Sequence, residues 1–119
     1  MNENLEFDEK FSVLDEYYTI NSSEEIKVQL RKNENIFQLL EEVKPYLEEY
    51  FSDAEFCLDM NFEPELADRY LVLRVMVSSE KFDDGAFEEI NHIRNEIRPI
   101  RRRINVFRQL AIRLGIKDV

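Results

Sequence analysis

The residues that could do chemistry are few in this sequence and lie far apart. His92 is the only histidine and Cys57 the only cysteine, so neither has a second soft ligand with which to form a zinc site. The two glycines, Gly85 and Gly115, form no phosphate-binding loop, and no G-x-S-x-G, H-E-x-x-H or C-x-x-C motif occurs. A general base needs oriented partners, and a nucleophile needs a base beside it. The sequence therefore predicts a protein that is not an enzyme and that holds no metal or cofactor.

Charge is the most distinctive property of the chain. The formal net charge is −10 over 119 residues, and it is unevenly placed. Residues 1–90 contain 24 acidic and 8 basic side chains, whereas residues 91–119 contain 2 acidic and 8 basic ones. An acidic body repels nucleic-acid phosphates and anionic lipid, and it attracts a basic protein. We therefore expect a protein-interaction or regulatory module, antitoxin-like or an adaptor, that binds a basic partner.

The acidic residues expected to contact such a partner lie on the polar side of a central helix and in the loop of a hairpin. They are Glu41, Glu42, Glu48, Glu49, Glu63, Glu65 and Asp68. The loop residues could also hold a hard cation, but their spacing does not match that of an EF-hand loop. A solvated acidic loop is the favoured interpretation, and no metal site is expected there.

The arginines near the end of the chain suggest an alternative function. Most of this set, to which Arg103 also belongs, follow an apolar helical stripe by one position, so on a helix they would form a band. Such a band can contact the phosphates of a nucleic acid. The residues expected to do so are Arg94, Arg98, Arg101, Arg102, Arg108 and Arg113. The competing interpretation, favoured by the acidic body next to them, is that these arginines pair with the protein's own carboxylates or with a neighbouring copy.

Two segments with apolar residues at every second position predict the centre of the fold. They cover residues 54–62 and 70–77, and this period is typical of strands with one buried face. Pro64 and several acidic residues separate them, so we expect an antiparallel hairpin. A two-stranded hairpin alone is marginally stable in water. Amphipathic helices on both sides of it in the sequence must cover its apolar face, which defines an α+β fold class with a small antiparallel sheet.

Apolar residues at spacings of three and four predict the covering helices. The expected ranges are 23–32, 34–51, 84–97 and 100–114. Ser22 and Glu25 match a capping box at the start of the first helix. Pro45 predicts a kink inside the second helix, and Pro99 separates the last two.

Three features of the elements stay open at this level. Residues 104–114 also alternate with the period of a strand, although Gly115 just after them favours a helix. Residues 13–20 have enough aromatic and β-branched side chains to add a third strand to the hairpin. Residues 1–12 are polar and acidic, so we expect a mobile segment there and a single domain over residues 13–119.

The sequence also bears on location and assembly. Its start has neither the basic region nor the apolar run of a signal peptide, and no apolar stretch is long enough to span a membrane. We expect a cytoplasmic protein without membrane insertion. The regular apolar stripe after residue 84 is expected to be core, and it could also supply contact in a homodimer.

Three stretches carry a resemblance to other proteins. They are Ser23–Ile26, the helical segment Leu39–Phe51 and the loop Phe62–Glu65. Together they resemble small acidic bacterial proteins of no assigned activity, over residues 22–90. From Arg94 onward the chain has no counterpart in such proteins. The resemblance identifies no specific family and implies no catalytic or binding residue.

Overall fold

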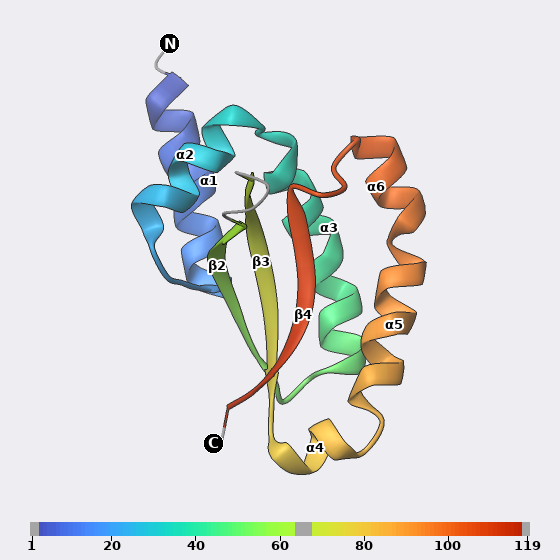
Figure 1. Ribbon diagram of the computed structural model, residues 1–119. Coiled ribbons are helices and arrows are strands. Elements are labelled where there is room, and N and C mark those ends of the chain that lie inside the picture. Colours follow the sequence, from blue (N-terminus) through green and yellow to red (C-terminus); the bar gives the residue numbers. More distant parts are fainter. Residues whose placement is uncertain (1–2, 64–67, 118–119) are drawn as a thin grey trace.

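The computed structural model describes residues 3–63 and 68–117 of the chain. In chain order its elements are α1 (Glu3–Tyr17), β1 (Thr19–Ile20), α2 (Ser23–Lys32), α3 (Asn35–Tyr50), β2 (Glu55–Glu63), β3 (Asp68–Val77), α4 (Ser79–Asp83), α5 (Ala86–Glu96), α6 (Arg98–Ile104) and β4 (Leu110–Ile116). Figure 1 shows the strands side by side, with helices behind and beside them. The fold is α+β, as predicted.

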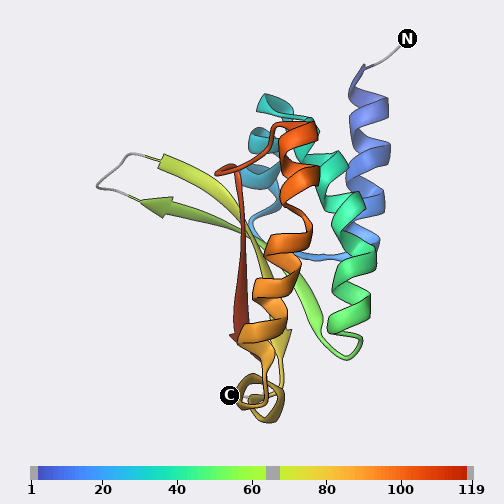
Figure 2. The same ribbon diagram turned by 90° about the vertical axis from the view of Figure 1, so that its right-hand side faces the viewer.

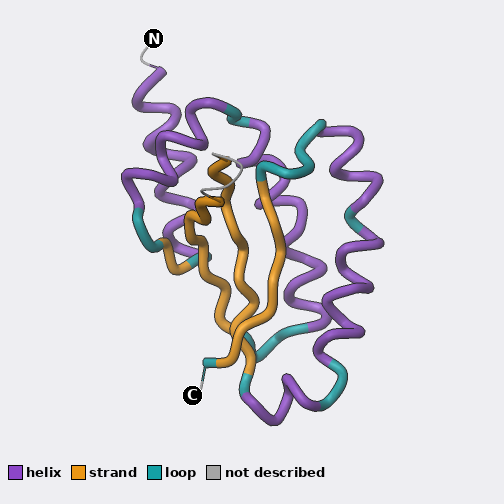
Figure 3. Tube along the Cα trace, in the orientation of Figure 1, coloured by secondary structure: helices purple, strands orange, loops and turns teal. Residues whose placement is uncertain are grey.

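The four strands form one sheet in the order β1-β2-β3-β4. The predicted hairpin is its centre, since β2 and β3 pair antiparallel from Glu55↔Met76 to Glu63↔Asp68. The two outer strands each run parallel to their neighbour, β1 beside β2 and β4 beside β3. The sheet is therefore mixed, which corrects the expected antiparallel sheet. Figure 2 shows that the helices gather on one side of the sheet, and Figure 3 shows the same division into a strand layer and surrounding helices.

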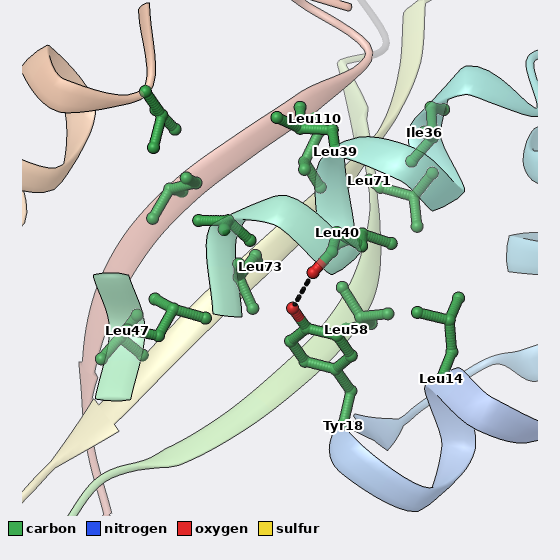
Figure 4. Close-up of a cluster of buried hydrophobic side chains, with 14 of the residues drawn as sticks. Leu14, Tyr18, Ile36, Leu39, Leu40, Leu47, Leu58, Leu71, Leu73 and Leu110 are labelled. Atoms are coloured by element: carbon green, nitrogen blue, oxygen red, sulfur yellow. Dashed lines mark hydrogen bonds between the residues drawn. The ribbon is translucent and has the colours of Figure 1, made fainter. Parts of the chain in front are cut away.

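The core lies between the sheet and the helices. Leu71, Leu73 and Val75 of β3 point to the helical side and are fully buried. Leu58 of β2 and Ile112 of β4 flank Leu73 in the register and are buried as well. Figure 4 shows leucines of α3 packed over these strand residues. Burying one such side chain stabilises the fold by about 1.5–3 kcal/mol, so this layer accounts for much of the stability.

Helix α1 packs against α3 through its own apolar residues. Phe7 is 5% exposed, and its ring meets that of Phe37 edge to face at a centroid distance of 5.4 Å. Tyr18, just after the helix, is buried, and its hydroxyl donates to the Leu40 carbonyl at 2.7 Å. Burial raises the pKa of Tyr18, so this hydroxyl stays protonated and keeps donating.

Two expectations about the N-terminal region are therefore corrected. Helix α1 runs across the expected boundary between residues 1–12 and residues 13–119, because Phe7, Leu14 and Tyr18 form an apolar stripe with partners on other helices. The strand expected over 13–20 is limited to Thr19–Ile20, which does extend the sheet beside β2. The aromatic and β-branched content predicted a strand there. The apolar residues of this segment also have a helical period, and the helix forms because α3 covers its apolar side.

The C-terminal region contains the third correction. The helix expected over 100–114 ends at Ile104, where Asn105 adopts a left-handed conformation with φ of 64°. Residues Leu110–Ile116 form a strand, the alternative that the alternating pattern had left open. Its apolar residues join the core, and its backbone pairs with β3, whose groups would otherwise be unpaired.

The remaining helices lie close to their predicted ranges, with differences at their ends. The capping box is wrong, because Ser22 has a φ of 54° and its side chain makes no cap hydrogen bond. Pro45 lies inside α3, which continues to Tyr50. The short α4 was not expected, and its N-cap Ser78 accepts a hydrogen bond from the Lys81 N–H at 3.1 Å. None of the described helices is long and apolar enough to cross a membrane.

Candidate functional site

The predicted acidic residues of α3 lie at or near the surface beside α1. Glu41, Glu48 and Glu49 are exposed, and Glu42 is half-buried. The Tyr17 hydroxyl of α1 donates to Glu48 Oε1 at 3.2 Å, so the two helices run close together here. The acidic helical surface, as we name it, combines the exposed glutamates of α3 with exposed glutamates of α1. It consists of Glu6, Glu9, Glu16, Glu41, Glu48 and Glu49.

Internal pairing occupies part of this surface. Glu41 pairs with Lys44 at 2.9 Å on the same helix. Glu42 pairs with Arg103 of α6 and also accepts from Gln38, at 3.0 Å. The hydrogen bond from Arg103 is the main cause of a lowered pKa of Glu42, and it keeps this carboxylate charged. Glu42 therefore links α3 to α6 through an ion pair, whereas most of the neighbouring carboxylates point to solvent.

The hairpin residues do not join this surface. Glu63 and Asp68 form the last register pair of β2 and β3, and Glu65 lies outside the described residues. Figure 2 shows this end of the hairpin projecting away from the helical layer, on the side opposite α1. The α3 glutamates and the described end of the hairpin that carries Glu63 and Asp68 therefore lie apart.

The arginines do not form the single band that one long helix would have made. Arg94 donates to the Ile112 carbonyl at 2.5 Å, and Arg101 donates to the Phe107 carbonyl at 2.6 Å. Burial lowers the pKa of Arg101, whose guanidinium stays charged at neutral pH. Arg113 lies in β4, where it donates to the Tyr70 hydroxyl at 2.8 Å. These three arginines stabilise the protein's own loop and strands.

Three other arginines are directed to solvent. Arg98 and Arg102 of α6 and Arg108 in the following loop are exposed, and they form no ion pair with the described residues. Arg98 and Arg102 are four residues apart on one helix, so they share a side of it. The predicted phosphate-binding set is thus reduced to three side chains at one end of the molecule.

The second face of the sheet was not singled out from the sequence. No described helix covers it, as Figure 2 shows. We call it the open sheet face. Its described residues are Thr19, Glu55, Cys57, Asp59, Asn61, Tyr70, Val72, Arg74, Met76, Ala111, Arg113 and Gly115. The sequence could have identified this face, because its residues alternate along each strand with the buried apolar residues.

Side chains on the open sheet face cover one another. Val72 is fully buried there, although it lies outside the main core cluster. Arg74 pairs with Asp59 at 3.3 Å, and the Arg113 guanidinium lies 5.5 Å from the centre of the Tyr70 ring. Burial, followed by the charge of Asp59, raises the pKa of the Cys57 thiol. Cys57 therefore does not have the lowered pKa that activates a reactive cysteine.

One cavity of about 220 Å³ lies beyond the carboxyl ends of β3 and β4. Its lining is formed by Tyr50, Phe51, Ser52, Asp53, Ala54, Val77, Ser78, Lys81 and Lys117. The two lysines already have partners, because Lys117 donates to the Asp53 carbonyl at 2.7 Å and Lys81 pairs with Glu89 at 2.9 Å. His92 stacks on Tyr50 but does not line the cavity. Among the described residues no group of three side chains is placed to hold a metal ion.

The fold and these surfaces define a small α+β chain with an acidic helical side and an uncovered sheet face. No family model, curated protein or solved structure matches this chain.

Proposed function

We propose that this chain is a non-enzymatic protein-interaction module that binds a basic partner through the acidic helical surface. The observation that supports the proposal is the gathering of exposed carboxylates on two adjacent helices, α1 and α3, joined by the contact between Tyr17 and Glu48. Such a surface attracts a basic protein over about a Debye length, near 8 Å at physiological salt. A cytoplasmic adaptor or an antitoxin-like protein that covers a basic surface is the role that fits.

The test compares two variants with the same change in net charge. One carries Glu9→Gln, Glu16→Gln and Glu49→Gln on the acidic helical surface. The control carries Glu80→Gln, Asp83→Asn and Glu88→Gln, which are exposed acids of α4 and α5. Each tagged protein is used for quantitative affinity capture from native lysate, and captured proteins are then measured singly against both variants. We expect the captured proteins to include basic ones that bind the first variant about tenfold more weakly than the wild type and bind the control variant like the wild type. The reason is that specific charge pairs at an interface act locally.

Two results would contradict this proposal. One is an equal loss of binding in both variants, which would mean that net charge alone governs capture. The other is a captured set without basic proteins.

The exposed set of Arg98, Arg102 and Arg108 supports a second candidate function, binding of nucleic acid. Three phosphate contacts would weaken binding to duplex DNA about 40-fold between 50 and 200 mM salt, from a slope of about −0.9 per contact, and binding to a single strand about 20-fold, from a slope of about −0.7. Fluorescence anisotropy with labelled duplex DNA and with single-stranded RNA measures this loss. We expect the triple variant R98Q/R102Q/R108Q to abolish this salt-dependent binding. The absence of binding by the wild-type chain at 50 mM salt would exclude this function.

A further inference from the structure

The outer edge of β4 carries backbone groups that point away from the sheet. Among the described strands, β4 is the last in the sheet order and pairs only with β3. The Gln109 carbonyl accepts from the Leu71 N–H at 3.0 Å, and the Lys117 N–H donates to the Val77 carbonyl at 2.9 Å. Backbone groups alternate in direction along a strand. Residues with odd numbers in β4 therefore face β3, and those with even numbers point outward.

Part of this edge is already covered. Arg94 of α5 reaches over it and donates to the outward carbonyl of Ile112. No hydrogen bond from the described residues reaches the outward groups of Leu114 and Ile116. In Figure 1 helices α5 and α6 lie beyond β4, and Figure 2 shows them on the helical side of the sheet, so the helical layer is wider than the sheet. An additional strand next to β4 would therefore have α5 and α6 on one of its two faces.

The charged side chains of β4 and of the residue that follows it, Arg113 and Lys117, are basic, whereas the chain as a whole is acidic. β4 contains no acidic residue, and it contributes Arg113 to the open sheet face. Lys117 continues this row, and Arg94 lies on the other side of the strand. The groups to which these three side chains donate carry no charge; they include the Tyr70 hydroxyl and the Asp53 and Ile112 carbonyls. Cross-strand pairs of opposite charge are favourable, whereas like charges placed opposite each other are destabilising. An acidic strand therefore complements this edge.

We propose that the edge of β4 binds an extended acidic segment of a partner protein, which adds to the sheet as a fifth strand. Strand addition gains its affinity from main-chain hydrogen bonds to groups such as those of Leu114 and Ile116, and its specificity from alternate side chains. A second copy of this chain is a poorer occupant, because pairing of β4 with its own equivalent brings Arg113 and Lys117 of both copies together. This surface is separate from the acidic helical surface, so the two proposals can fail independently.

The probe is a labelled, end-capped peptide in which valine alternates with glutamate, and the matched peptide has lysine in place of glutamate. Amide hydrogen exchange of the wild-type chain is followed with each peptide. We expect the glutamate peptide to slow exchange at the Leu114 and Ile116 amides, and the lysine peptide to have no effect. Equal binding of both peptides, or protection that does not include these two amides, would overturn the proposal.

A matched pair of variants tests the backbone contact itself. Ile116→Pro removes an outward N–H without removing a bond to β3, a position at which an edge strand tolerates proline. Ile116→Val retains the N–H and serves as the control. Fluorescence anisotropy is expected to show at least a tenfold loss of peptide affinity for I116P and less than a twofold change for I116V. The variant E9Q/E16Q/E49Q should bind the peptide like the wild type.

Sedimentation velocity over a range of protein concentrations separates a partner strand from a second copy. A dimer that forms in the wild type and is lost in I116P would assign the edge to self-association and overturn the proposal. Circular dichroism shows whether I116P is folded. If I116P is not folded, the hydrogen-exchange experiment on the wild-type chain alone decides whether the edge of β4 binds the acidic peptide.

Discussion

Replacing Leu73 with alanine is expected to lower the free energy of unfolding by about 3 kcal/mol. Leu73 is fully buried at the centre of β3, between Leu58 of β2 and Ile112 of β4 in the register. The substitution removes buried methyl groups and leaves a cavity that strands paired on both sides cannot close. Urea denaturation followed by circular dichroism measures the change. The loss is a large fraction of the total stability of a domain of this size.

Leu5→Ala in α1 is the matched control for this substitution. Leu5 is 59% exposed, so the same deletion there should change the free energy of unfolding by less than about 0.5 kcal/mol. Similar effects at the two positions would mean that β3 is not the centre of the core.

Replacing Phe7 with alanine is expected to cost about 3 kcal/mol of unfolding free energy. The ring is 5% exposed, meets Phe37 edge to face, and has the Arg31 guanidinium 4.6 Å from its centre. Loss of the ring removes buried apolar area, an aromatic pair and a cation–π contact together. Urea denaturation again provides the measurement. The result decides whether the first turns of α1 belong to the folded unit in solution.

Phe87→Ala is the control for Phe7→Ala, because Phe87 is 58% exposed on α5. Its ring contacts that of Phe82, so a loss of at most about 1 kcal/mol is expected. A loss of less than about 0.5 kcal/mol for Phe7→Ala would contradict the packing of α1 on α3.

The two proposed surfaces would give this chain the properties of an adaptor. The acidic helical surface lies on α1 and α3, and α1 contacts β1 at one end of the sheet. The edge of β4 lies at the opposite end of the sheet. One surface would attract a basic partner through side-chain charge, and the other would bind an acidic strand through backbone hydrogen bonds. A chain with two such surfaces could bind two different proteins without any catalytic group.

Much of the fold was predictable because its elements carry strong local periods. The hairpin of β2 and β3 follows from alternation with a period of two, and helices α2, α3 and α5 follow from apolar residues spaced by three and four. The net charge and the missing motifs are also properties of the sequence alone, and the proposed function starts from them. The acidic residues of α3 are directed to solvent because they occupy the polar side of an amphipathic helix.

The spatial grouping of the candidate site residues was harder to predict, because it depends on which elements meet. The acids of α3 and of the hairpin end were expected to form one surface, but the hairpin projects away from the helices. The arginines would have formed a band on one long helix, whereas the favoured interpretation was that they pair with the protein's own carboxylates. Four of them contact the protein's own strand, loop or helix, and one of these four pairs with a carboxylate, Glu42. These contacts are made by Arg94, Arg101, Arg103 and Arg113. Neither arrangement can be derived from spacing along the chain.

The sequence by itself determined the α+β class, the central hairpin, most of the helices and the separation of charge, because each depends on neighbours within a few residues along the chain. Only the tertiary structure decided that residues 110–116 are a strand and that the segment around Phe7 is a buried part of the fold. Both segments have a local pattern that fits more than one state. The free energy that selects one state comes from partners distant in sequence, the open edge of β3 in one case and the ring of Phe37 in the other.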